Sequence, residues 1–311
     1  MLQFDQTDYL PKSSQRIERL YRIVNNRPAA ILCPGPSINT LEQRIHDLKK
    51  ENICWVSLNH YTVIEKNILN QINKNLSVLF CSAREFLPTL YGDIQNFLNR
   101  DDQNIFISSF WREAYGLMDS SFQLKEFIKE YDEKMLFFSI QQNDKVPNEH
   151  FPLHLMHSNS LLGLIQMILL GQPQAVYLFG ADGYCPDDQP HYYRAEDDGH
   201  RGDVHKTIKV GKLEDLKYDT NKLFNPVARK AIRNVTQTFK LQETSIYNCS
   251  PESYYLPFPK IAYDDALKLL TRKQVFNPKM DLRTPEEKKL VQSYQRSGFV
   301  SKLKSLFLRN A

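Results

Sequence analysis

Residues 29–38 read AAILCPGPSI and predict the unit on which the fold is built. The first five, all small or branched and apolar, are typical of a short buried strand. Residues 34–37 follow as a Pro-Gly-Pro-Ser turn, and residues 39–50 carry apolar residues at helical spacing. In such a βα unit a ligand can approach the turn backbone, and the helix start favours negative charge. The alternative is a plain sharp turn with Ser37 near a helix cap.

Composition places the chain among ordinary globular proteins. It has 311 residues, 41% hydrophobic and 24% charged, enough for one large or two modest domains. The net charge of +4 gives no case for a nucleic-acid partner. The five cysteines include no CxxC pair, which favours a reducing compartment and gives no structural-zinc signature. The polar N-terminus and the lack of a long apolar run predict a cytoplasmic protein without a membrane span.

Strands alternate with helices along the chain, which is typical of a parallel sheet. Expected strands are residues 29–33, 53–59, 76–81, 104–108, 135–140, 175–179 and 245–248, and expected helices are residues 14–25, 39–50, 63–73, 84–99, 161–171 and 226–241. The predicted fold class is α/β, a Rossmann-like (GT-A-variant), mainly parallel sheet flanked by helices.

The chain is expected to have three parts: a helical lead at residues 1–27, a Rossmann-like domain at 28–260 and a helical extension at 261–311. Residues 185–221 lack periodicity and are rich in Asp, Gly, His and Lys, which predicts a lid. Residues 285–309 predict a basic amphipathic helix. This helix could lie on an anionic membrane surface or pack on its own domain.

Small polar residues follow several predicted strands, and ligands of open α/β sheets bind at the carboxyl ends of strands. Ser37, Asn59 and Ser82 follow the first three strands, and Asp182 lies between two glycines after residues 175–179. Asn159 and Ser160 form a cap-like start to the apolar helix at 161–171. Together these residues predict a nucleotide cradle.

Three segments resemble the bacterial sialyltransferases of glycosyltransferase family 42, and the first also resembles the related MptE-like proteins. They are the Gly-Pro-Ser turn at 35–37, residues 158–184 from SNS through VYLFGAD to Tyr184, and residues 246–253, IYNCSPES. The resemblance implies a modified Rossmann-like domain that binds a nucleotide sugar under a lid. It also implies inverting transfer of sialic acid from CMP-sialic acid, with no metal or other cofactor required.

The resemblance also implies roles for single residues. Tyr184 would hydrogen-bond the departing CMP phosphate, and Tyr192 or Tyr193 would supply a second hydroxyl. Aimed hydroxyls of this kind stabilise a leaving phosphate without a metal. The donor-binding set comprises Gly35, Pro36, Ser37, Asn59, Ser82, Asn159, Ser160, Gly180, Asp182 and Ser250.

Two departures from the family pattern concern the reaction. Pro34 stands where the family has an Asn, and residues 219–226 lack the histidine that the family uses as its general base. His205, or alternatively His200 or His191, could replace that base.

Three functions therefore remain open. The first is transfer of a CMP-activated sugar to a surface glycan, of the lipopolysaccharide or capsule kind, beside the inner membrane. The second is an MptE-like pterin diphosphokinase that uses ATP and Mg²⁺, with Asp182, Asp187 and Asp188 as oxygen ligands. The third is a non-catalytic protein that binds a nucleotide or a glycan.

Overall fold

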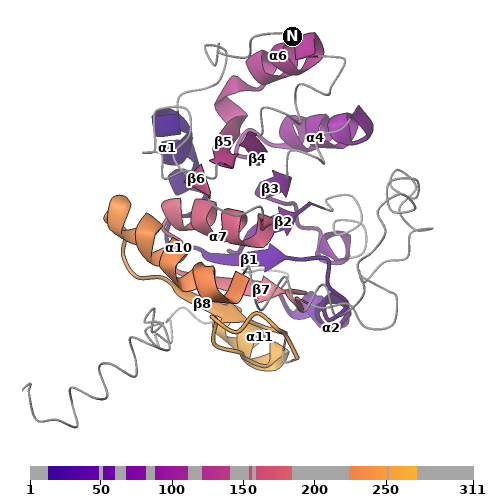
Figure 1. Ribbon diagram of the computed structural model, residues 1–311. Coiled ribbons are helices and arrows are strands. Elements are labelled where there is room, and N and C mark those ends of the chain that lie inside the picture. The colour runs from indigo at the N-terminus through magenta and orange to yellow at the C-terminus, as the bar shows by residue number, and fades with distance from the viewer. Residues whose placement is uncertain are drawn as a thin grey trace, which may run out of the picture.

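A single parallel sheet forms the centre of the computed structural model, which describes residues 13–48, 52–59, 68–81, 88–110, 121–140, 154–155, 159–183, 224–250 and 252–271. Within these ranges eight strands pair in the order β6-β5-β4-β3-β2-β1-β7-β8 (Figure 1). Every pairing is parallel. The predicted α/β Rossmann-like class is confirmed.

The strands are β1 Pro28–Leu32, β2 Cys54–Leu58, β3 Val78–Cys81, β4 Ile105–Phe110, β5 Met135–Ile140, β6 His154–Leu155, β7 Ala175–Phe179 and β8 Ser245–Asn248. The α-helices are α1 Ser13–Val24, α2 Ile38–Glu42, α4 Pro88–Arg100, α6 Ser121–Glu130, α7 Ser160–Leu170, α10 Asn225–Thr238 and α11 Tyr263–Thr271. Short 3₁₀ helices are η1 Ile45–Leu48, η2 Leu69–Ile72 and η4 Asp132–Lys134.

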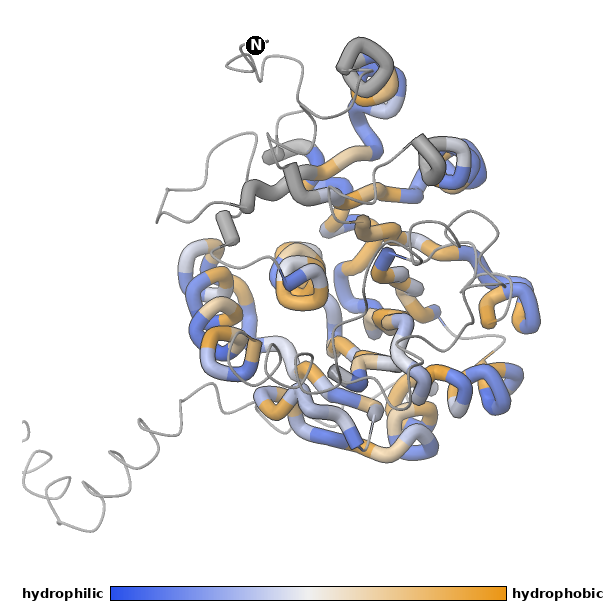
Figure 2. Tube along the Cα trace, turned by 45° about the vertical axis from the view of Figure 1, so that its right-hand side comes forward, coloured by the Kyte–Doolittle hydropathy of each residue, from blue (hydrophilic) through white to orange (hydrophobic). Residues whose placement is uncertain are grey.

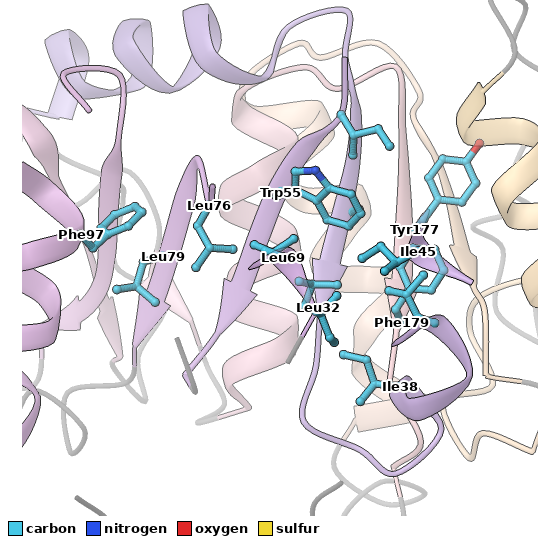
Figure 3. Packing of buried hydrophobic residues seen from close by; sticks show 14 of the residues in the cluster. Leu32, Ile38, Ile45, Trp55, Leu69, Leu76, Leu79, Phe97, Tyr177 and Phe179 are labelled. Atoms are coloured by element: carbon cyan, nitrogen blue, oxygen red, sulfur yellow. The ribbon is translucent and has the colours of Figure 1, made fainter. Parts of the chain in front are cut away.

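Helices cover both faces of the sheet, because its strands alternate apolar side chains between two cores. On β2, for example, Trp55 belongs to one core and Val56 to the other. The first core includes residues of α2, η1, η2, α4, α6 and α11, and Figure 3 shows part of it around Trp55. The second core includes residues of α1, α7 and α10.

Helix α7 is largely apolar and buried on all sides. Residues 161–170 are all buried, and the helix packs against α1 and α10. In Figure 2 it is the mainly orange, hydrophobic helix near the centre. It begins where the Asn159 side chain accepts a hydrogen bond from the Leu162 N–H at 3.0 Å. It ends at Gly171, where a Cβ would lie 2.7 Å from the Cβ of Val24. Both ends are therefore fixed by the residues that the sequence suggested.

The order in which strands are added to the sheet reverses between β1 and β7. From β1 it proceeds through α2, on the first face, to β2. From β7 the next described helix is α10, on the opposite face, which leads to β8. The loops after these adjacent strands thus leave on opposite faces. In open α/β sheets this switch point is where ligands bind.

Two predicted helices differ from the structure. Residues 39–50 do not form one helix but the short α2 followed by η1. The Arg44 N–H bonds to Leu41 O at 2.9 Å, an i→i−3 bond that tightens the chain. Of the expected helix at 63–73, the described part is only the 3₁₀ helix η2. Helix α6 and strand β6 were not predicted.

The segments at both ends of the described chain belong to the central fold. Leu20 and Val24 of α1 lie in the second core, and Tyr263 and Leu270 of α11 lie in the first. Helix α11 is thus part of the helical layer on that face of the sheet. The tail helix expected at 285–309 lies outside the described residues. No helix in the described ranges combines the length and the apolarity required to cross a bilayer.

The end of α10 provides a test of local backbone strain. Lys240 has φ 51°, and the following Leu241 N–H closes the helix on Thr236 O at 2.9 Å. A left-handed conformation costs an L-residue roughly 1–2 kcal/mol, whereas glycine adopts it freely but gains unfolded-state entropy. We expect Lys240→Gly to stabilise the protein by about 0.5–1 kcal/mol. Urea denaturation measures this, and Lys240→Ala, which keeps the Cβ, should show no gain.

Candidate functional site

Four side chains from separate segments meet at the carboxyl edge of the sheet, beside the switch point. They are Ser37 after β1, Asp182 after β7, Ser250 after β8 and Tyr263 at the start of α11, and we call them the strand-end cluster. Three of the four, Ser37, Asp182 and Ser250, were predicted as site residues. The structure therefore brings together residues that are far apart in sequence.

Asp182 binds Ser37 through both of its carboxylate oxygens. The Ser37 backbone N–H donates to Oδ2 at 2.9 Å, and the Ser37 hydroxyl donates to Oδ1 at 2.5 Å. Asp182 is only 4% exposed, so these two bonds replace water at a buried carboxylate. Its position before α2 had suggested that the Ser37 side chain caps that helix, but it makes no capping hydrogen bond.

The proton positions in this chain follow from donor and acceptor capacity. A carboxylate only accepts, so the single hydroxyl proton of Ser37 points to Asp182. The Ser37 and Ser250 hydroxyl oxygens are 2.7 Å apart, and Ser250 must therefore be the donor of that bond. Hydroxyl protons thus run in one direction, from Ser250 to Ser37 to Asp182.

Two glycines allow the loops after β1 and β7 to touch. The Gly35 N–H donates to Gly180 O at 3.0 Å, and a Cβ on Gly35 would lie 2.3 Å from that oxygen. The same Cβ would lie 2.6 Å from Asp182 Oδ2. Gly180 has φ 69°, and its Cβ would meet Cys33 O at 2.2 Å. The predicted positions Gly35 and Gly180 are therefore required for backbone contact.

The Pro-Gly-Pro-Ser turn has its backbone donors occupied. Besides Gly35 and Ser37, the N–H groups of Ile38, Asn39 and Thr40 donate to Gly35 O, Pro36 O and Ser37 O at 3.1–3.2 Å. Pro34 and Pro36 carry no N–H. The turn, Pro36 included, is thus closed on itself and on Asp182, and it offers a phosphate no open backbone donor.

Tyr263 connects α11 to the same turn. Its hydroxyl donates to Ser37 O at 2.7 Å and lies 3.3 Å from Ser37 Oγ. Burial is the main cause that raises the pKa of Tyr263, and its hydrogen bond with Ser37 opposes the rise. The sequence had given no reason to select Tyr263.

Asn248 and Ser253 fix the loop after β8. The Asn248 amide donates to Ala181 O at 3.2 Å and to Ser253 Oγ at 2.8 Å, while its oxygen accepts from the Ser250 N–H at 3.0 Å. The Ser253 hydroxyl donates to Ala181 O at 2.5 Å. Both side chains are buried, and they hold Ser250 in place for its bond with Ser37.

Tyr255 joins the start of α7 to this region. Burial raises its pKa first, and the neighbouring Cys33 raises it further; a hydrogen bond with Asn159 lowers it, and the charge of Asp182 again raises it. Its ring packs on Phe224 with centroids 4.4 Å apart. Asn159 and Ser160, both partly buried, therefore lie at the same edge as the cluster. The sequence analysis did not select Tyr255 as a site residue.

Asn59 follows β2, the strand that flanks β1 on the side opposite to β7. It adopts φ 69°, and its N–H donates to Phe80 O at 2.7 Å. Residues other than glycine rarely adopt this left-handed backbone conformation, although Asn tolerates it better than most.

Other predicted site residues lie outside the described part of the chain: Ser82, Tyr184, Tyr192, Tyr193, His191, His200, His205, Asp187, Asp188 and the 185–221 lid. Within the described part, no group of three or more His, Cys, Asp or Glu side chains is placed to hold a metal ion.

The chain matches no protein-family model, and no curated protein matches its sequence significantly.

The close contact between the loops after β1 and β7 predicts that adding one methyl group at Gly35 lowers the stability of the protein. Gly35→Ala should destabilise the protein by about 1–3 kcal/mol or more, because both neighbours of the new Cβ are held in place. Gly92→Ala is the matched control, since a Cβ at this exposed position of α4 would meet nothing within 4 Å. It should stabilise the helix by up to about 1 kcal/mol. Equal effects of the two changes in urea denaturation would contradict the close contact.

Removal of the Tyr263 hydroxyl should affect both stability and its pH dependence. Tyr263→Phe loses the bond to Ser37 O and should cost about 0.5–1.5 kcal/mol at neutral pH. Above about pH 10 the unfolded chain releases tyrosine protons that the folded chain, with its raised pKa, retains, so stability falls as pH rises. The variant should show a slope shallower by up to about 1.4 kcal/mol per pH unit. Parallel curves for the wild type and the variant would contradict this assignment.

Proposed function

We propose that this chain is a glycosyltransferase that moves a CMP-activated sugar of the sialic acid type to a surface glycan, with inversion and without a metal. The observation that carries the proposal is the position of the strand-end cluster. It lies at the carboxyl edge between β1 and β7, the switch point at which α/β sheets bind nucleotides. The resemblance in residues 158–184 and 246–253 supplies the class of donor.

In this proposal the negative part of the donor faces α7 rather than the β1 turn. The turn is closed by internal hydrogen bonds and has the buried Asp182 carboxylate beside it, so a phosphate there would meet like charge. Helix α7 has 11 residues; the Asn159 side chain accepts from the Leu162 N–H and the Asn159 carbonyl from the Gly163 N–H. The N–H groups of Ser160 and Leu161 and the Ser160 hydroxyl are the donors suited to a phosphate or a sugar carboxylate in this proposal.

Tyr184, with Tyr192 or Tyr193, would stabilise the departing CMP, as the resemblance implies. Activity beside the inner membrane, through peripheral contact of the basic segment 285–309, is also part of the proposal. Aimed hydroxyl and backbone donors supply what a metal supplies in other transferases. The CMP-sugar is a substrate, and no further cofactor is invoked.

A donor screen tests the reaction. The protein is incubated with CMP-sugars, other nucleotide sugars, or ATP plus hydroxymethylpterin, each with and without EDTA. We expect CMP release that EDTA does not affect. ATP turnover abolished by EDTA would instead support a pterin diphosphokinase. Saturable thermal stabilisation by CMP without turnover would indicate a binding protein.

A second measurement tests where the nucleotide binds. Ser160→Ala should weaken CMP about tenfold, as expected for the loss of one hydrogen bond to a charged group. Ser77→Ala is the matched control, because Ser77 immediately precedes β3 at the opposite edge of the sheet. Isothermal titration of both variants should separate them. Equal affinities would place CMP away from α7.

A further inference from the structure

The proposed transfer requires a group that takes the proton of the acceptor hydroxyl, and the strand-end cluster contains one. Asp182 is a buried carboxylate that ends a directed chain of hydroxyl protons. The family histidine is missing from residues 219–226, so the role of base is open in this chain. Ion pairs within the described residues involve other carboxylates.

We propose that Ser37 and Asp182 form a proton relay, in which Ser37 Oγ receives the acceptor proton and passes its own to Asp182 Oδ1. This inference rests on the proposed transfer reaction. The Ser37 hydroxyl already donates to Asp182 Oδ1, so the transfer of its proton follows an existing hydrogen bond. The Ser37 N–H on Oδ2 fixes the carboxylate in the required orientation.

Exposure decides which member meets the acceptor. Asp182 is 4% and Ser250 1% exposed, whereas Ser37 is partly exposed. Ser37 is thus the catalytic residue, and Asp182 acts through it. Ser37 Oγ accepts from Ser250 at 2.7 Å, and its other contact, with the Tyr263 hydroxyl, is long at 3.3 Å. Because Tyr263 binds Ser37 O more closely, an acceptor hydroxyl can take this second position.

The step balances without a redox partner. The acceptor O–H bond breaks, and the acceptor oxygen forms the new bond to the anomeric carbon of the sugar. The bond from that carbon to the phosphate oxygen breaks, and its electron pair leaves with CMP. One proton moves from the acceptor to Ser37, and the original Ser37 proton moves to Asp182. Asp182 releases this proton to water after the products depart.

The test measures transfer and donor binding separately in Asp182→Asn and Ser37→Ala. We expect transfer from CMP-sialic acid to lactose to fall about 10²-fold or more in both. Stabilisation of each variant by CMP should persist. The matched control is Thr236→Ala, which also removes an internally hydrogen-bonded hydroxyl, 2.8 Å from Ile232 O, but lies near the end of α10, away from the strand-end cluster. It should keep transfer within about threefold of the wild type.

A pH profile of the wild type tests the relay without a variant. A histidine base would make kcat/KM fall about tenfold per pH unit below about pH 6.5, and a relay without a histidine predicts no fall of that histidine type. A histidine-type fall, or a loss of transfer confined to His205→Asn, would overturn the relay while leaving the transferase intact. No CMP release by the wild type would contradict the proposed function itself.

Discussion

The hydrogen bonds between Asp182 and Ser37 hold together the switch point, where the strand order of the sheet reverses between β1 and β7. They join the loop after β1 to the loop after β7, two loops that leave on opposite faces. Ser250 adds the loop after β8, and Tyr263 adds helix α11. A buried carboxylate is costly unless its partners are correctly placed, so these segments must adopt their positions together.

The Pro-Gly-Pro-Ser turn could have both positioned Ser37 and bound the anionic group of a ligand, but in this arrangement it does only the first. The turn positions Ser37 against Asp182, and its own N–H groups are engaged in doing so. The start of α7, beside Tyr255, is where the proposed donor would place its anionic group. The proposed donor orientation and the proposed proton relay both follow from this separation.

Sequence periodicity was sufficient for the described strands other than β6, because parallel strands buried on both faces appear as short apolar runs. Residues 135–140, 175–179 and 245–248 match β5, β7 and β8 residue for residue. The two-residue β6 has too few residues to show a pattern, and α2 and η1 depend on how the chain returns to β2. Among the site residues, Ser37, Asp182 and Ser250 follow buried strands and could be selected. Tyr263 does not follow a strand but begins α11, and its place in the cluster depends on where that helix packs. The sequence therefore contained no signal for it.

The proposed function requires that the nucleotide bind at the carboxyl edge of the sheet around the switch point. Hydrogen–deuterium exchange with and without saturating CMP tests this most directly, because it reports on each segment of the chain. We expect added protection in residues 33–40, 159–163, 180–183 and 248–255, with little change at the amino edge around residues 26–28 and 172–175. Protection at the amino edge, or none at the carboxyl edge, would contradict it.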